Sequence, residues 1–124
     1  MTKFKAQGLN NTFKNARKGF RLVLKSELNI RIHVAIAFLV IFLALILKFS
    51  ALEFCILLFV IGLVIVAEML NTAIEFTLDS IYHNRYSRMV GMAKDISAGA
   101  VMFATIISVL VGIILFGSKF LGQF

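Results

Sequence analysis

Residues 54–79 read FCILLFVIGLVIVAEMLNTAIEFTLD, an apolar run that turns acidic without a proline. Its first half, residues 54–66, carries no charged side chain, and three carboxylates follow at Glu68, Glu75 and Asp79. Because an α-helix advances about 100° per residue, offsets of 7 and 11 residues return close to the starting direction. The spacing therefore predicts one helix whose acids share a stripe.

The position of Glu68 indicates a functional acid rather than a solvated acid at the end of a membrane helix. A carboxylate costs at least about 2.5 kcal/mol at mid-membrane on insertion scales, and acids inside membrane segments usually face a polar interior or a ligand. A helix leaving the bilayer accounts for Asp79, whereas Glu68 directly follows the apolar run. Thr72 falls on the same stripe and Asn71 stands beside it, so we expect a functional acidic face.

The composition predicts an integral membrane protein. The chain has 124 residues, 60% of them hydrophobic, and thirteen are Phe, which is more apolar surface than a soluble domain of this size can cover. The formal charge is +7, but eight of the thirteen basic residues precede residue 33. Basic residues clustered beside a membrane segment indicate topology and attraction to anionic lipid rather than nucleic acid. Cys55, the single cysteine, excludes an intrachain disulfide.

The hydropathy pattern predicts an all-α integral membrane fold in one domain. Apolar residues at helical spacing, with basic residues between them, predict an amphipathic helix on the membrane surface over residues 12–26; a tail with only topological meaning is the alternative. Apolar runs predict membrane helices over residues 30–48, 52–80 and 96–116. We expect Asp95, with Ser97, to cap the last of these helices. Small residues recur every four positions along its face and favour close helix packing: Ala100, Ala104, Ser108 and Gly112.

The distribution of charge predicts the topology. The N-terminal segment and the 82–94 connector are basic, whereas the turn at residues 48–53 holds one Lys and one Glu. The positive-inside rule therefore predicts a cytoplasmic N-terminus and places the acidic face on the side that contains ATP.

Several charged groups are expected at one depth if the helices pack together. Glu27, Glu68 and Glu75 supply carboxylates, and Lys94 and Asp95 begin the last predicted membrane helix. Two carboxylates suit Mg²⁺, a further one can take a proton from a hydroxyl, and a lysine can neutralise phosphate charge. This set suits phosphoryl transfer, although the P-loop and protein-kinase signatures are absent from the sequence. A proton-coupled carrier subunit or a non-catalytic assembly partner remains open at this point.

The pattern Glu68-x-x-Asn71-x-Ala73-x-Glu75-x-x-x-Asp79, followed by Ala93-Lys94-Asp95, resembles the prokaryotic diacylglycerol kinase / undecaprenol kinase family. Lys18-Gly19-Phe20-Arg21 and Glu27 fit the N-terminal pattern of the same family, so the resemblance spans about residues 13–116. It implies a surface helix plus three membrane helices in the bacterial inner membrane, assembled as a homotrimer. It also implies direct transfer of the ATP γ-phosphate to a lipid hydroxyl.

The resemblance implies a role for each matching residue. Glu68 is the expected general base. Glu27 and Glu75 are expected to bind Mg²⁺ together with ATP. Three further residues are expected to bind ATP: Asn71, Lys94 and Asp95. Arg31 and Glu68 are expected to bind the lipid substrate.

The substrate expected from the resemblance is undecaprenol. Glu27-x-Asn29-x-x-x-His33 and residues 71–75 look closer to the undecaprenol kinase branch, and the sequence lacks the Trp residues typical of the diacylglycerol branch. His33 stands where the diacylglycerol branch has an acid, and is interpreted as an interfacial side chain or a catalytic group. Diacylglycerol is the alternative substrate.

Overall fold

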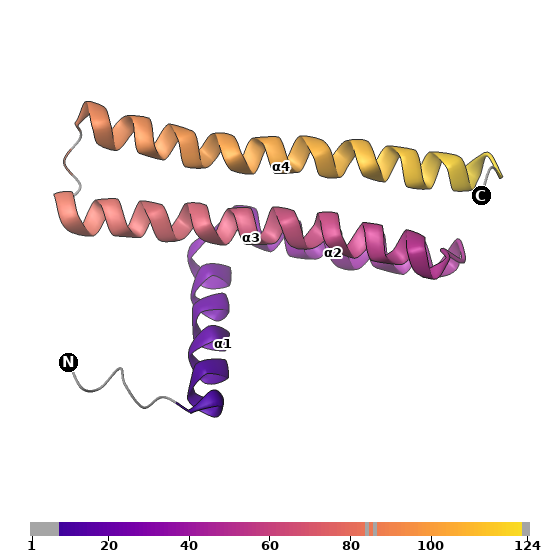
Figure 1. Cartoon of the computed structure of the whole chain (residues 1–124), viewed down its shortest axis with the longest axis horizontal. Helices are drawn as coiled ribbons and strands as arrows, with labels where there is room; N and C mark the ends of the chain where they lie inside the picture. The colour runs from indigo at the N-terminus through magenta and orange to yellow at the C-terminus, as the bar shows by residue number, and fades with distance from the viewer. Residues whose placement is uncertain (1–7, 84, 86, 123–124) are drawn as a thin grey trace.

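The structure is a computed structural model that describes residues 8–83, 85 and 87–122. Over these residues the chain forms four helices, α1 (Leu9–Ser26), α2 (Leu28–Ile46), α3 (Ala51–Tyr82) and α4 (Arg88–Phe120). In Figure 1, α2, α3 and α4 run alongside one another, and α1 lies crosswise to them. The predicted all-α fold is confirmed.

Three helices are long and apolar enough to cross a membrane: α2, α3 and α4, with 19, 32 and 33 residues. At 1.5 Å per residue, α3 and α4 are each about 48 Å long, whereas the hydrocarbon of a bilayer is about 30 Å thick. Both helices are therefore longer than the hydrocarbon layer is thick. The outward faces of α2, α3 and α4 carry exposed apolar side chains such as Phe38, Phe59 and Phe103, respectively, which suit contact with lipid.

Short polar signals set the helix boundaries. Glu27 adopts an extended conformation between α1 and α2, and this single residue turns the chain from one helix into the other. A capping box begins α3, in which the Ser50 side chain accepts from the Glu53 backbone N–H while the Glu53 carboxylate accepts from that of Ser50. His83 ends α3 in the left-handed conformation.

The last helix begins at Arg88 rather than at residue 96. The Ser87 side chain accepts a hydrogen bond from the Val90 backbone N–H and caps α4. The predicted cap at Asp95 and Ser97 is therefore wrong, since both residues lie inside the helix. The first two turns of α4, residues 88–95, contain polar residues and lie outside the apolar run. Hydropathy therefore does not detect them.

The centre of the bundle is α3, which packs against both α2 and α4. A buried cluster lies near the α2–α3 turn and consists of Ala44, Phe49, Leu57 and Leu115. There the ring of Phe49 packs at 4.9 Å between centroids on Phe116 of α4. We call this end of the bundle the turn end, and the opposite end, where α3 passes into α4, the connection end.

Candidate active site

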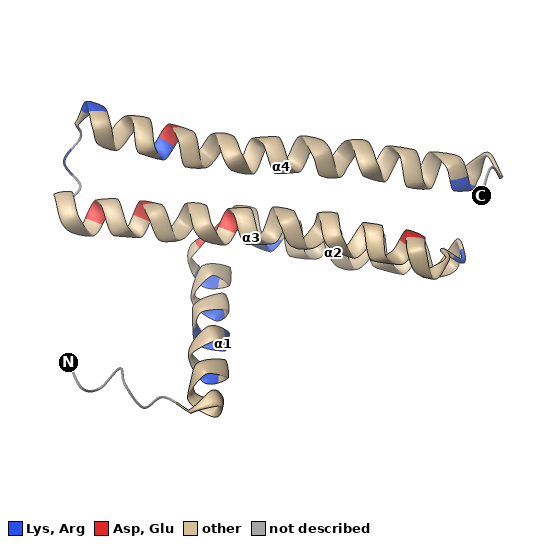
Figure 2. Ribbon diagram, viewed as in Figure 1, with Lys and Arg blue, Asp and Glu red and all other residues tan. Residues whose placement is uncertain are grey.

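One face of α3 is buried along most of the bundle, and two carboxylates lie on it. Its buried residues recur every three or four positions: Glu53, Leu57, Val60, Val64, Glu68 and Thr72. Thr72 is 2% exposed and Glu68 is 5% exposed, deep among apolar neighbours. Figure 2 shows most acids of α3 toward the connection end and one acid near the turn end. Glu68 is thus an enclosed carboxylate, as the sequence stripe predicts.

Glu68 contacts a histidine from the neighbouring helix α2. Its Oε1 lies 3.2 Å from the Nε2 of His33, whose side chain is 25% exposed. No other ion pair or hydrogen bond reaches the Glu68 side chain from the residues that the structure describes. Among the described residues, the His33 imidazole is therefore the polar side-chain group in contact with this carboxylate.

A second polar network joins α3 to α4 close to Glu68. The Ser97 hydroxyl donates to Asn71 Oδ1 at 2.6 Å, and Asn71 Nδ2 donates to Glu75 Oε1 at 3.2 Å. A flipped amide would turn its oxygen toward the Glu75 carboxylate, so the carboxylate fixes the orientation of Asn71. The same hydroxyl lies 3.0 Å from the Lys94 carbonyl oxygen. Through this network α4 orients a carboxylate of α3.

Lys94 also faces α3. Its Nζ lies 2.7 Å from Asp79 Oδ1, and both side chains are 38% exposed. A pair this exposed contributes little to stability, at most about 1 kcal/mol. The ion pair instead fixes the position of Lys94, which lies one helical turn from Ser97 and next to Asp79 of α3.

The other predicted site residues make no side-chain hydrogen bond or ion pair with these networks among the described residues. Glu27 is half-buried at the corner between α1 and α2, and its side chain makes no capping hydrogen bond. Arg31 and Asp95 are exposed. Within the described part of the chain, no three His, Cys, Asp or Glu side chains are grouped so that they could hold a metal ion.

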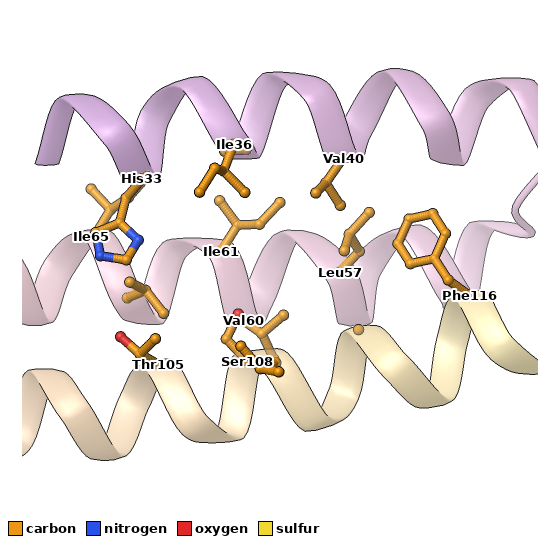
Figure 3. A pocket seen from close by; sticks show the side chains of 14 residues that line it. His33, Ile36, Val40, Leu57, Val60, Ile61, Ile65, Thr105, Ser108 and Phe116 are labelled. Atoms are coloured by element: carbon orange, nitrogen blue, oxygen red, sulfur yellow. The ribbon is translucent and has the colours of Figure 1, made fainter. Parts of the chain in front are cut away.

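An apolar cavity of about 260 Å³ lies between α2, α3 and α4. Figure 3 shows His33 toward one end of it and Phe116 toward the other, with Ile36, Val40, Leu57 and Ile61 along its length. The stripe of small residues on α4 opens this space, since Ser108 and Gly112 line it and a Cβ built on Gly112 would meet nothing within 4 Å. Because His33 also contacts Glu68, the cavity ends next to the enclosed carboxylate.

Sequence reasoning missed two members of these networks, His33 as the partner of Glu68 and Ser97 as the partner of Asn71. Both contacts cross between helices, so no spacing along one helix could have indicated them. The sequence does show that residues 94–97 are polar, but polar residues before an apolar run are also typical of a helix cap.

These features define a small integral membrane protein with a polar site at one end of a three-helix bundle. The model of the prokaryotic diacylglycerol kinase family matches residues 14–116, and the chain belongs to that family. An undecaprenol kinase of Bacillus subtilis is 34% identical over 114 residues, which cover 90% of this chain and 92% of that protein.

Two further relatives are diacylglycerol kinases. The enzyme of Synechocystis sp. is 35% identical over 107 residues, covering 86% of this chain and 61% of that protein. The enzyme of Escherichia coli is 33% identical over 103 residues, covering 83% of this chain and 84% of that protein. The predicted family is confirmed, and so is the prediction of a lipid kinase. This result disfavours the non-catalytic and carrier alternatives.

Proposed function

We propose that the protein transfers the γ-phosphate of Mg-ATP directly to the hydroxyl of undecaprenol, with Glu68 as the general base. The observation that carries this proposal is the burial of Glu68 beside an apolar cavity, with His33 as its single partner. The undecaprenol kinase relative matches over nearly its whole length and favours this lipid. The two relatives named diacylglycerol kinase make diacylglycerol the second candidate.

The cavity, of about 260 Å³, suits the hydroxyl-bearing end of a lipid alcohol, with the rest of the chain outside it. Its walls are apolar between His33 and Phe116, and it runs along the membrane helices away from the acids. The end of a prenyl chain in this space brings the terminal hydroxyl to Glu68, and Arg31 contacts the lipid. Glu68 takes the hydroxyl proton, the oxygen attacks the γ-phosphorus, and the bond to the β–γ bridging oxygen breaks to release ADP.

The ATP side of the site is built from the more exposed residues. Glu75 and Glu27 are half-buried carboxylates, and Mg²⁺ prefers one or two carboxylates together with substrate phosphates, so this donor set fits the ion. When bound, Mg²⁺ neutralises part of the phosphate charge. Asn71 holds Glu75 in place. Lys94 contacts a phosphate, leaving or sharing its pairing with Asp79, and Asp95 orients the nucleotide.

The protein lies in the bacterial inner membrane with its N-terminus and the connection end in the cytoplasm. The crosswise helix α1 supports this placement because its cations are exposed and an exposed apolar side chain, Phe13, lies among them. We assign α1 to the cytoplasmic membrane surface as an amphipathic helix.

The functional unit is a homotrimer. Within one chain, only 11% of the membrane window of α4 is buried, and Glu75 and Lys94 remain half-exposed at the site. Neighbouring subunits would cover these groups and complete the nucleotide site. Native mass spectrometry from nanodiscs should give three copies, and a fully active monomer in a bilayer would refute this assembly.

The test of the proposed function is phosphate transfer by purified protein in nanodiscs. Radiolabelled γ-phosphate of ATP is followed into undecaprenol and into diacylglycerol, supplied in separate samples. Faster labelling of undecaprenol is expected, and loss of that labelling in Glu68→Gln. Labelling of diacylglycerol alone would move the assignment to the second candidate, and labelling of neither lipid would overturn it.

A further inference from the structure

His33 joins the two halves of the candidate site. It comes from α2, lines the apolar cavity at one end, and lies with Nε2 3.2 Å from Oε1 of Glu68. The cavity is otherwise apolar around it, apart from hydroxyls such as that of Thr105. One imidazole therefore touches both the space assigned to the lipid and the carboxylate assigned as base.

The contact is chemically directed. A carboxylate only accepts hydrogen bonds, so a hydrogen bond between these two atoms requires the proton to be on His33 Nε2. An enclosed carboxylate with no donor carries a large desolvation penalty, and the imidazole from α2 is the polar group placed beside Glu68 to offset part of it. The described residues offer no hydrogen bond to Oε2 of Glu68, so this oxygen is the one available to a substrate hydroxyl.

We propose that His33 is a positioning residue for Glu68: its Nε2–H holds Oε1 and thereby turns Oε2 toward a lipid hydroxyl at the end of the cavity. This inference rests on the proposed function, in which Glu68 is the base. His33 acts through Glu68 and transfers no proton to or from the substrate. A merely interfacial histidine would have no such coupling.

Two amide substitutions at His33 have similar polarity but place the N–H group at different distances from the backbone. In His33→Gln, the terminal amide N–H extends about as far as imidazole Nε2, whereas in His33→Asn it ends one methylene shorter. We expect His33→Asn and His33→Leu to lower kcat for undecaprenol by about 10- to 100-fold, the range found when a side chain that orients a metal ligand is removed. We expect His33→Gln to keep most of the turnover and KM for Mg-ATP to stay unchanged in all three.

A double substitution tests whether the loss of turnover in His33→Asn arises through Glu68. Because His33 acts through Glu68, adding His33→Asn to Glu68→Gln should lower turnover no further. Phe38→Leu, a lipid-exposed change on the same helix, is the matched control and should leave kcat unchanged. All variants are assayed in nanodiscs, with turnover expressed per folded molecule.

Three results would overturn the inference: normal kcat in His33→Asn, equal losses in His33→Gln and His33→Asn, or losses that multiply in the double variant. The fate of the proposed function is read separately from Glu68→Gln alone. If that variant turns over normally, the general base is wrong, whatever the His33 variants do. If it is inactive while His33→Asn is normal, only the role of His33 fails.

Discussion

Glu53 and Glu68 lie on the same buried face of α3 and are almost equally enclosed, 7% and 5% exposed, yet their surroundings differ. At the turn end, Oε1 of Glu53 accepts from the Ser50 backbone N–H at 2.7 Å and from Lys119 Nζ at 2.9 Å. The Lys119 ammonium also lies 5.8 Å from the centre of the Phe49 ring. Glu68 has a polar contact only with His33 among the residues that the structure describes.

The difference separates a structural acid from the acid that we propose as the general base. Glu53 starts α3 and ties it to the end of α4 through a cation, so its charge is matched within the fold, although its buried Oε2 has no partner among the described residues. Glu68 joins no lysine or arginine in the described part of the chain and begins no helix. A buried acid with so little compensation lowers stability, and such residues persist where function needs them.

The largest expected effect is at Glu68. Glu68→Gln keeps the shape of the side chain and removes the base, so turnover with undecaprenol should fall by about 10²–10⁴-fold, the usual contribution of a general base. The KM for Mg-ATP and the trimer should barely change. Steady-state kinetics in nanodiscs measures this, and normal turnover would put Glu68 in the same class as Glu53.

The next largest effect tests whether Glu75 binds the metal ion while Glu68, on the same helix α3, acts as the base. Glu75→Gln should lower kcat/KM for Mg-ATP by about 100-fold and shift the Mg²⁺ dependence to higher concentration, because even an indirect partner of a metal ligand is worth 10- to 100-fold. Glu27→Gln should act in the same direction. A Mg²⁺ titration checks both, with Glu53→Gln as the control. An unchanged Mg²⁺ dependence in Glu75→Gln would remove it from the metal site.

The turn end should respond in stability and not in chemistry. Lys119→Met leaves the enclosed Glu53 carboxylate without its cation, so the midpoint of thermal unfolding should fall by several degrees. Adding Glu53→Gln to Lys119→Met removes the unpaired charge and should recover part of the loss. Turnover per folded molecule should stay near that of the parent. A loss of turnover with an unchanged midpoint would reverse the roles assigned to the two ends.

A smaller effect is expected at Ser97. Ser97→Ala removes the hydroxyl that fixes the Asn71 amide, and a hydrogen bond worth about 1 kcal/mol corresponds to about a fivefold loss in kcat/KM for Mg-ATP. Ser118→Ala, near the opposite end of α4, is the matched control. Equal kinetics in the two variants would show that Glu75 does not depend on α4 for its orientation.

The helices and the buried stripe were predictable because they depend on local sequence. Hydropathy marks the membrane runs, and the helical period places Glu68 and Thr72 on one face, where both are buried. The start of α4 was not predictable from hydropathy, since its first turns lie outside the apolar run. The partners of the acids were not predictable either, because Ser97 is 26 residues from Asn71 and Lys119 is 66 residues from Glu53 in the chain. Which residues meet across helices depends on how the helices pack.

The most direct test compares Glu53→Gln and Glu68→Gln in the same nanodiscs, with turnover divided by the fraction of folded protein. Both substitutions remove one buried charge from the same face of α3 and change the side-chain shape very little. We predict that Glu53→Gln turns over like the parent and has a lower unfolding midpoint, whereas Glu68→Gln loses about 10²–10⁴-fold in turnover and unfolds no earlier than the parent. Similar losses of turnover in both variants, or normal turnover in Glu68→Gln, would contradict the account.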